Sequence, residues 1–166
     1  MRKLALFAAF ALCAAACSGD DDSSSDTASA DAFLGKWSCS RTGNLTFTSP
    51  AGLPDQTLST TTTLVFYAPS YGVLQGTESN GDSGPSCNIN FHTLSASTAG
   101  LDTGLSCTDS TGLSVTFTGG SAVSGGASKL NVSLNFSFSG QLANDAGTSA
   151  AVSGTGTFAY VCAPTS

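Results

Sequence analysis

Apolar and polar residues alternate with a period of two along most of the chain after residue 32. The clearest run is 129–139, where Leu, Val and Phe at every second position are separated by Asn and Ser. A period of two places the two sets on opposite faces of a β-strand, and no helical period of 3.6 fits this run. Shorter runs of the same kind occupy 60–68, 87–93, 113–117 and 158–162. The pattern therefore predicts an all-β domain with one apolar face.

Clusters of Gly, Pro, Asn and Asp separate these runs and predict turns at 50–52, 80–82, 119–120, 125–126 and 144–147. Between them we expect about eight strands, near 34–48, 57–68, 72–79, 86–95, 101–107, 112–118, 128–141 and 149–162. The outward faces are rich in Ser, Thr and Asn and hold little Lys, the usual guard of a sheet edge. Closure removes the edges, so we expect an antiparallel up-and-down meander that closes into a barrel, with a β-sandwich as the alternative.

The N-terminal segment has a different pattern. Basic Arg2 and Lys3 precede an apolar run over 4–16, which is shorter than the about 20 residues of a membrane-spanning helix and fits a signal peptide. The sequence Ala14-Ala15-Ala16-Cys17 resembles the lipobox of bacterial lipoproteins. The resemblance implies a signal peptide over 1–16, cleavage before Cys17 and lipid on that cysteine. An ordinary secretory leader is the alternative.

The segment 17–31 is acidic, polar and almost free of apolar residues, so we expect a disordered tether that joins the lipid to a barrel domain over 32–166. Ser18 after the cysteine resembles outer-membrane sorting signals of Gram-negative bacteria. The acidic run 20–22 resembles surface-export signals, and a plain solvated spacer is the alternative. These resemblances imply an outer-membrane lipoprotein, held by its lipid and facing the periplasm or the cell surface.

Charge excludes one class of partner. The chain carries a net charge of −6, and loss of the leader would leave −8 with three basic residues, Lys36, Arg41 and Lys129. Nucleic-acid binding requires a basic surface that neutralises phosphates, so we expect no nucleic-acid partner. The same charge disfavours electrostatic binding to an anionic membrane.

Four cysteines remain after Cys17, and an even number in an exported chain predicts two disulfides. Cys87 begins the fourth expected strand and Cys107 ends the fifth, so a hairpin would place them side by side. Cys39 lies in the first strand and Cys162 in the last, which become neighbours if the barrel closes. We therefore predict the pairs Cys39–Cys162 and Cys87–Cys107, of three possible connectivities.

The sequence Gly35-Lys36-Trp37 at the start of the first expected strand resembles the Gly-x-Trp of lipocalins and avidin-like barrels. In lipocalins this Trp plugs the closed end of the barrel beneath an Arg from the final strand, but 149–162 contains no Arg. An ordinary core aromatic is the alternative for Trp37. The overall texture of the chain also resembles lipoproteins of GC-rich bacteria such as myxobacteria, which implies no activity.

Residues able to carry chemistry are few and scattered. The only histidine, His92, is predicted on the outer face. Glu78 and five aspartates lie in or beside expected turns, where we interpret them as turn-forming residues: Asp55, Asp82, Asp102, Asp109 and Asp145. Ser110 has no positioned base, and no nucleophile, phosphate or metal-ligand motif occurs. We expect no catalytic residues, no metal and no cofactor.

The remaining function is a non-catalytic binding or interaction role at the cell envelope. Its partner is a protein, a glycan or a small apolar ligand. Two narrower alternatives are a lipocalin-like carrier, with the ligand inside the barrel, and an inhibitor of lysozyme-type enzymes. Phenylalanines on the expected inner faces favour an interior filled by side chains: Phe47, Phe66, Phe91, Phe117, Phe136 and Phe158.

Overall fold

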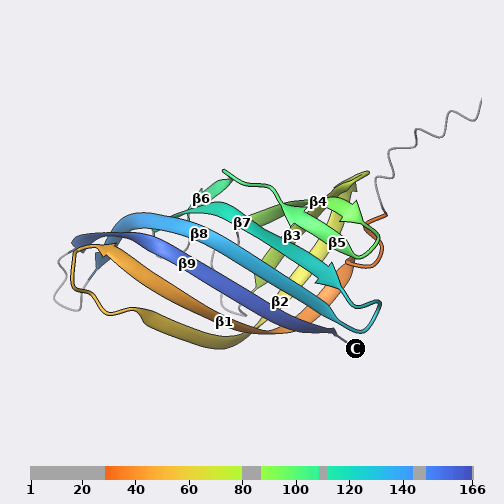
Figure 1. Ribbon diagram of the computed structural model, residues 1–166, viewed down its shortest axis with the longest axis horizontal. Helices are drawn as coiled ribbons and strands as arrows, with labels where there is room; N and C mark the ends of the chain where they lie inside the picture. The colour runs from red at the N-terminus through yellow and green to blue at the C-terminus, as the bar shows by residue number, and fades with distance from the viewer. Residues whose placement is uncertain (1–28, 80–86, 109–111, 144–148, 166) are drawn as a thin grey trace, which may run out of the picture.

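The structure is a computed structural model that describes residues 29–79, 87–108, 112–143 and 149–165. Its strands are β1 (Gly35–Ser49), β2 (Gln56–Ser70), β3 (Val73–Ser79), β4 (Asn88–Ser95), β5 (Thr98–Leu101), β6 (Ser106–Thr108), β7 (Ser114–Ser124), β8 (Leu130–Ala143) and β9 (Ser149–Pro164). They form one sheet in the order β5-β4-β3-β2-β1-β9-β8-β7-β6, and a pairing between β5 and β7 closes it (Figure 1). The predicted antiparallel meander that closes into a barrel is confirmed, and the sandwich alternative is excluded.

The prediction of one strand over 101–107 is wrong, because the chain forms two short strands there, β5 and β6. Gly104 between them has a positive φ of 81°, which interrupts a strand. Its amide still donates to the carbonyl of Phe117 at 2.8 Å, so the interrupted segment stays beside β7. The barrel therefore has eight strands and one extra strand, β6.

The turn expected at Gly119-Gly120 is also wrong, since β7 runs through both glycines to Ser124. The β7–β8 register shifts between Phe117 and Gly119, which marks a bulge. Gly120 has a φ of 149°, and a Cβ there would overlap the carbonyl oxygen of Ser133. These glycines therefore permit a close approach between strands. Two other predicted turns, at 80–82 and 144–147, lie outside the described residues.

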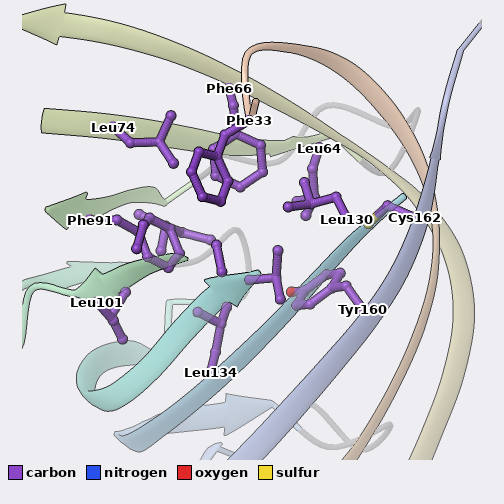
Figure 2. Packing of buried hydrophobic residues seen from close by; sticks show 14 of the residues in the cluster. Phe33, Leu64, Phe66, Leu74, Phe91, Leu101, Leu130, Leu134, Tyr160 and Cys162 are labelled. Atoms are coloured by element: carbon purple, nitrogen blue, oxygen red, sulfur yellow. The ribbon is translucent and has the colours of Figure 1, made fainter. Parts of the chain in front are cut away.

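The inner face of the barrel holds the apolar positions of the alternating runs. The clearest run is buried at every second residue of β8: Leu130, Val132, Leu134, Phe136 and Phe138. The alternation over 60–68 also predicts Ala68 on the inner face with Leu64 and Phe66, but Ala68 is exposed, because the β2–β3 register shifts after Tyr67. Figure 2 shows side chains from β2, β3, β4, β8 and β9 meeting in one core.

A turn formed by residues 30–34 fills one end of the barrel. Phe33 is fully buried, and Trp37 donates from Nε1 to the Phe33 carbonyl at 2.8 Å. Ser124 Oγ, at the end of β7, donates to the Ala32 carbonyl at 2.9 Å. The turn thus ties β1 to β7 across this end, which we call the plugged end. Ala30 is 7% exposed, so the folded part includes residues assigned above to the tether.

The opposite end, called the far end below, is built from fewer strands. Strands β1, β2, β8 and β9 have 14 to 16 residues, whereas β3, β4 and β5 have 7, 8 and 4. Figure 1 shows the four long strands continuing together past the short ones. One wall of the barrel therefore extends well beyond the other.

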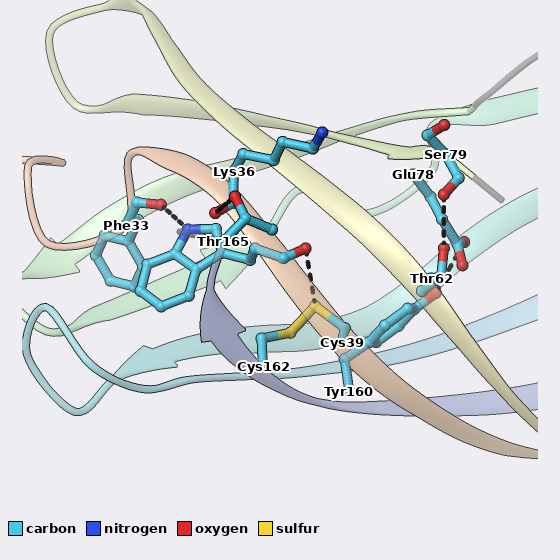
Figure 3. The surroundings of a disulfide bond; sticks show 10 residues. Phe33, Lys36, Cys39, Thr62, Glu78, Ser79, Tyr160, Cys162 and Thr165 are labelled. Atoms are coloured by element: carbon cyan, nitrogen blue, oxygen red, sulfur yellow. Dashed lines mark hydrogen bonds between the residues drawn. A yellow bond between two sulfur atoms is a disulfide. The ribbon is translucent and has the colours of Figure 1, made fainter. Parts of the chain in front are cut away.

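Both predicted disulfides are present. Cys39 and Cys162 lie directly opposite each other in the β1–β9 register, with Cα atoms 4.0 Å apart (Figure 3). The register is continuous from Trp37 to Phe47, so no bulge alters which face these residues share. The bridge between Cys87 and Cys107 joins the start of β4 to β6, two segments that share no described strand pairing.

Candidate functional site

A polar cluster of three side chains lies inside the barrel, surrounded by apolar residues. Arg41 Nη1 donates to Glu78 Oε1 at 2.7 Å, and Tyr160 Oη donates to Glu78 Oε2 at 3.1 Å. The Arg41 and Glu78 side chains are 16% and 17% exposed, and Tyr160 is 1% exposed. One carboxylate therefore accepts hydrogen bonds from two different strands.

Strand geometry brings these residues together. Arg41 lies opposite Tyr160 in the β1–β9 register, and both point inward because they share the face of the Cys39–Cys162 bridge. Glu78 comes from β3, where it continues the inward series of Leu74 and Gly76. The cluster thus joins β1 and β9 to β3 across the interior.

The position of Glu78 corrects the interpretation of that residue as turn-forming. Glu78 is the last but one residue of β3 and pairs in register with Leu64 of β2. Beside it, Thr62 Oγ1 donates to the Ser79 carbonyl at 3.1 Å, so the carbonyl of the last residue of β3 has a hydrogen-bond donor (Figure 3). The cluster therefore lies where β3 stops, and beyond it β2 continues toward the far end paired with β1 only.

Burial determines the protonation of the Tyr160 phenol. Burial raises the pKa of Tyr160 well above its ordinary value, and the nearby Glu78 carboxylate raises it further. The phenol therefore stays protonated and remains a hydrogen-bond donor to Glu78.

Arg41 has one donor that the described residues leave unused. Its guanidinium carbon lies 4.7 Å from the centre of the Phe158 ring, a cation–π contact. Its Nε atom is buried and has no hydrogen-bond partner within the described residues. A buried N–H without an acceptor is costly, so an acceptor that entered between the neighbouring side chains and reached this atom would bind favourably.

Apolar side chains, most of them aromatic, cover the inner face beyond Arg41, and we call this set the far-end face: Leu45, Phe47, Phe136, Phe138 and Phe158. Phe136 and Phe158 have ring centres 4.8 Å apart, and Phe47 meets Phe138 edge-on at 5.5 Å. Phe136 and Phe138 are buried, whereas the other three members are half-buried. Part of this apolar surface is therefore open to contact.

Glycines lie beneath these rings on neighbouring strands. A Cβ on Gly43 would overlap the Phe158 ring, and a Cβ on Gly156 would overlap the Phe136 ring. The rings therefore lie against the backbone of the adjacent strand. This packing agrees with the expectation that side chains fill much of the interior.

The other residues considered above lie elsewhere. His92 is on the outer face as predicted, but it has a partner, since its Nδ1 lies 2.7 Å from Asp102 Oδ1. Both side chains are exposed, at 53% and 41%. Asp55 is exposed before β2. Cys17, Asp82, Asp109, Ser110 and Asp145 lie outside the described residues.

Trp37 lies at the plugged end, where it is buried in the same cluster as Phe33 and donates from Nε1 to the Phe33 carbonyl. The only described arginine, Arg41, stacks on Phe158 and not on Trp37. Among the described residues, no group of three or more His, Cys, Asp and Glu side chains is placed to hold a metal. In the same part of the chain, no helix is long and apolar enough to cross a membrane.

The sequence contained a signal for the polar cluster. A period of two from Cys39 places Arg41 on the inner face, and the same count from Leu74 places Glu78 there. Two opposite charges at inward positions predict a buried pair, since a lone buried charge is very costly.

Comparison with known proteins adds no assignment: no protein-family model matches the sequence, and no curated protein matches it.

Proposed function

We propose that this protein is a lipid-anchored component of the bacterial cell envelope with a non-catalytic binding role. The leader over 1–16 and the Ala-Ala-Ala-Cys17 sequence support the anchor. The two disulfides support an oxidising compartment, because such bridges persist outside the cytoplasm. Two or three acyl groups anchor a chain stably to a membrane.

Changing Cys17 tests the anchor. The Cys17→Ala variant should leave the membrane fraction or retain its leader. Mass spectrometry of the wild-type protein should find Cys17 as the lipidated N-terminus. An unmodified Cys17, or cleavage at another residue, would end this part of the proposal.

The unused Nε donor of Arg41 carries the proposal for where binding occurs. It lies next to the half-buried ring of Phe158, at the border between the polar cluster and the far-end face. Small-molecule sites combine apolar walls with a few fixed polar groups. A small apolar molecule that carries a neutral oxygen acceptor fits this combination. No described residue favours inhibition of a lysozyme-type enzyme.

Nile red, a neutral apolar dye with a carbonyl group, is a suitable probe. We expect saturable binding with increased fluorescence. The Arg41→Lys variant keeps a cation for Glu78 but removes the Nε donor, and it should bind the dye several-fold more weakly. His92→Gln, which changes an exposed residue on the outer face, should bind as the wild type does. Equal binding by Arg41→Lys, or no binding by the wild type, would contradict this site.

A further inference from the structure

Exposed large apolar side chains gather at one end of the barrel. Of the seven among the described residues, only Leu53 lies at the far end, in the turn between β1 and β2. The other six surround the plugged end, and we call them the collar: Leu34, Tyr67, Tyr71, Leu94, Val123 and Val161. Single exposed apolar residues are ordinary on a soluble protein, but their concentration at one end is informative.

Strand positions fix the place of the collar. Tyr71 lies in the β2–β3 turn and is 76% exposed, and Leu94, 59% exposed, is the last but one residue of β4. Val123 and Val161 lie near the ends of β7 and β9, and both pair in register with Asn131 of β8. The collar thus draws on strands all round the barrel, so it surrounds the end and is no patch on one side.

Positive charge lies at the same end. Lys36 is the second residue of β1 and Lys129 lies just before β8, and both are exposed. Neither takes part in a salt bridge given for the described residues, whereas Arg41 is paired inside the barrel. Asp31, which is also exposed, precedes Lys36 in the sequence and lies at the same end. Tyrosine, aliphatic residues and lysine together are typical of surfaces at a lipid interface.

The N-terminal segment reaches the folded domain at this end. Ser29, the first described residue, precedes the turn that plugs the barrel, and Cys17 lies twelve residues earlier in the sequence. Twelve residues span at most about 40 Å when extended. A lipid on Cys17 would therefore hold the plugged end, and not the far end, close to the bilayer.

We propose that the collar rests on the lipid surface that holds the anchor, so that the plugged end faces the membrane and the far-end face points away from it. The orientation rests on the proposed anchor. The anchor supplies proximity and the collar supplies the direction, because the net charge of −8 that remains after loss of the leader disfavours adsorption by charge alone. The site around Arg41 would then be presented to solvent.

Tryptophan reporters at the two ends test the orientation. Tyr71→Trp places a reporter in the collar, and Leu53→Trp is the matched control, an exposed apolar residue at the far end. The lipidated protein is reconstituted in vesicles of phosphatidylethanolamine and phosphatidylglycerol that include brominated lipid, with the wild type as background for Trp37. We expect bromine to quench Tyr71→Trp several-fold more than Leu53→Trp. Equal quenching, or stronger quenching of Leu53→Trp, would overturn the orientation.

An artificial anchor separates this inference from the proposed lipidation. The chain 18–166 contains every described core residue, and an N-terminal histidine tag attaches it to the same vesicles through a nickel-chelating lipid. Selective quenching of Tyr71→Trp there supports the collar even if Cys17 carries no lipid. The double variant Tyr71→Asp/Leu94→Asp, followed with a reporter at Val123→Trp, should lose that quenching, and Leu53→Asp should keep it. Retained quenching in the double variant would show that the collar does not make the contact.

Discussion

Arg41 and Glu78 show how a barrel interior accommodates charge. Each side chain is more than four-fifths buried, and each neutralises the other at 2.7 Å. Pairing limits the cost of burial, and Tyr160 supplies the second hydrogen bond that a buried carboxylate requires. The pair could be replaced by apolar residues without great loss, but either residue without the other would leave a costly charge.

A double-mutant cycle measures this dependence. Glu78→Gln leaves Arg41 unpaired and should lower the free energy of unfolding by about 2–4 kcal/mol, somewhat less than for a fully buried pair. Arg41→Met should also destabilise the protein. The double variant should lose at least about 1 kcal/mol less than the two single losses combined, because the partners interact directly. Urea denaturation checks this, and additive losses would show that the pair is not coupled.

Tyr160 predicts a loss of stability at alkaline pH. The raised pKa of its phenol means that the folded protein holds this proton more tightly than the unfolded chain. The contribution is fully present below the unfolded pKa of about 10 and falls as the pH rises above it, by at most about 1.4 kcal/mol per pH unit. Tyr160→Phe should flatten the decline of unfolding free energy above that pH. An unchanged slope in the variant would assign the decline to other groups.

Strands were the elements most readily predicted from the sequence. Alternation identified β8 closely because five apolar residues occupy consecutive inward positions there. The division into β5 and β6 was missed because the Asp102-Thr103-Gly104 turn lies inside a run that otherwise reads as extended. The β7 error has a different cause, since Gly119-Gly120 has the composition of a turn while its role is close strand contact.

The candidate site was predictable in part. Strand parity alone assigns Arg41 and Glu78 to the inner face. Their contact also depends on strand order and on where β3 ends, which the local pattern does not contain. The His92–Asp102 pair depends likewise on the β4–β5 register, where His92 lies opposite Gly100.

Glycines beneath the far-end face predict a test of packing between strands. A Cβ at Gly154 would overlap the carbonyl of Thr46 and the ring of Phe138. Because a backbone atom cannot move aside easily, Gly154→Ala should cost about 1–3 kcal/mol of unfolding free energy. Gly119→Ala is the control, since its Cβ would lie 3.6 Å from Asn135 Nδ2, an ordinary contact. Equal effects in thermal or urea unfolding would show that the rings do not require the glycine.

At the scale of the whole molecule, the two disulfides close different gaps. Cys39–Cys162 fixes the first strand to the last, where the β1–β9 ladder already pairs them. Cys87–Cys107 links β4 to β6, where no described ladder pairs the strands. The first bridge therefore joins strands that are already hydrogen-bonded, whereas the second joins strands that no described ladder connects.

Removing each bridge should therefore affect the global free energy of unfolding and local amide exchange to different extents. The sequence separations are 123 and 20 residues, so chain entropy predicts contributions of about 5 and 3 kcal/mol. Cys39→Ala/Cys162→Ala should therefore lower the global free energy of unfolding more, and it also removes two buried side chains. Cys87→Ala/Cys107→Ala should cost less globally, but amide exchange should increase in β4 and β6, because nothing else described joins them. Exchange that increases equally in β1 and β9 would contradict this, since it would mean that the β4–β6 bridge supports the whole barrel and not its own gap.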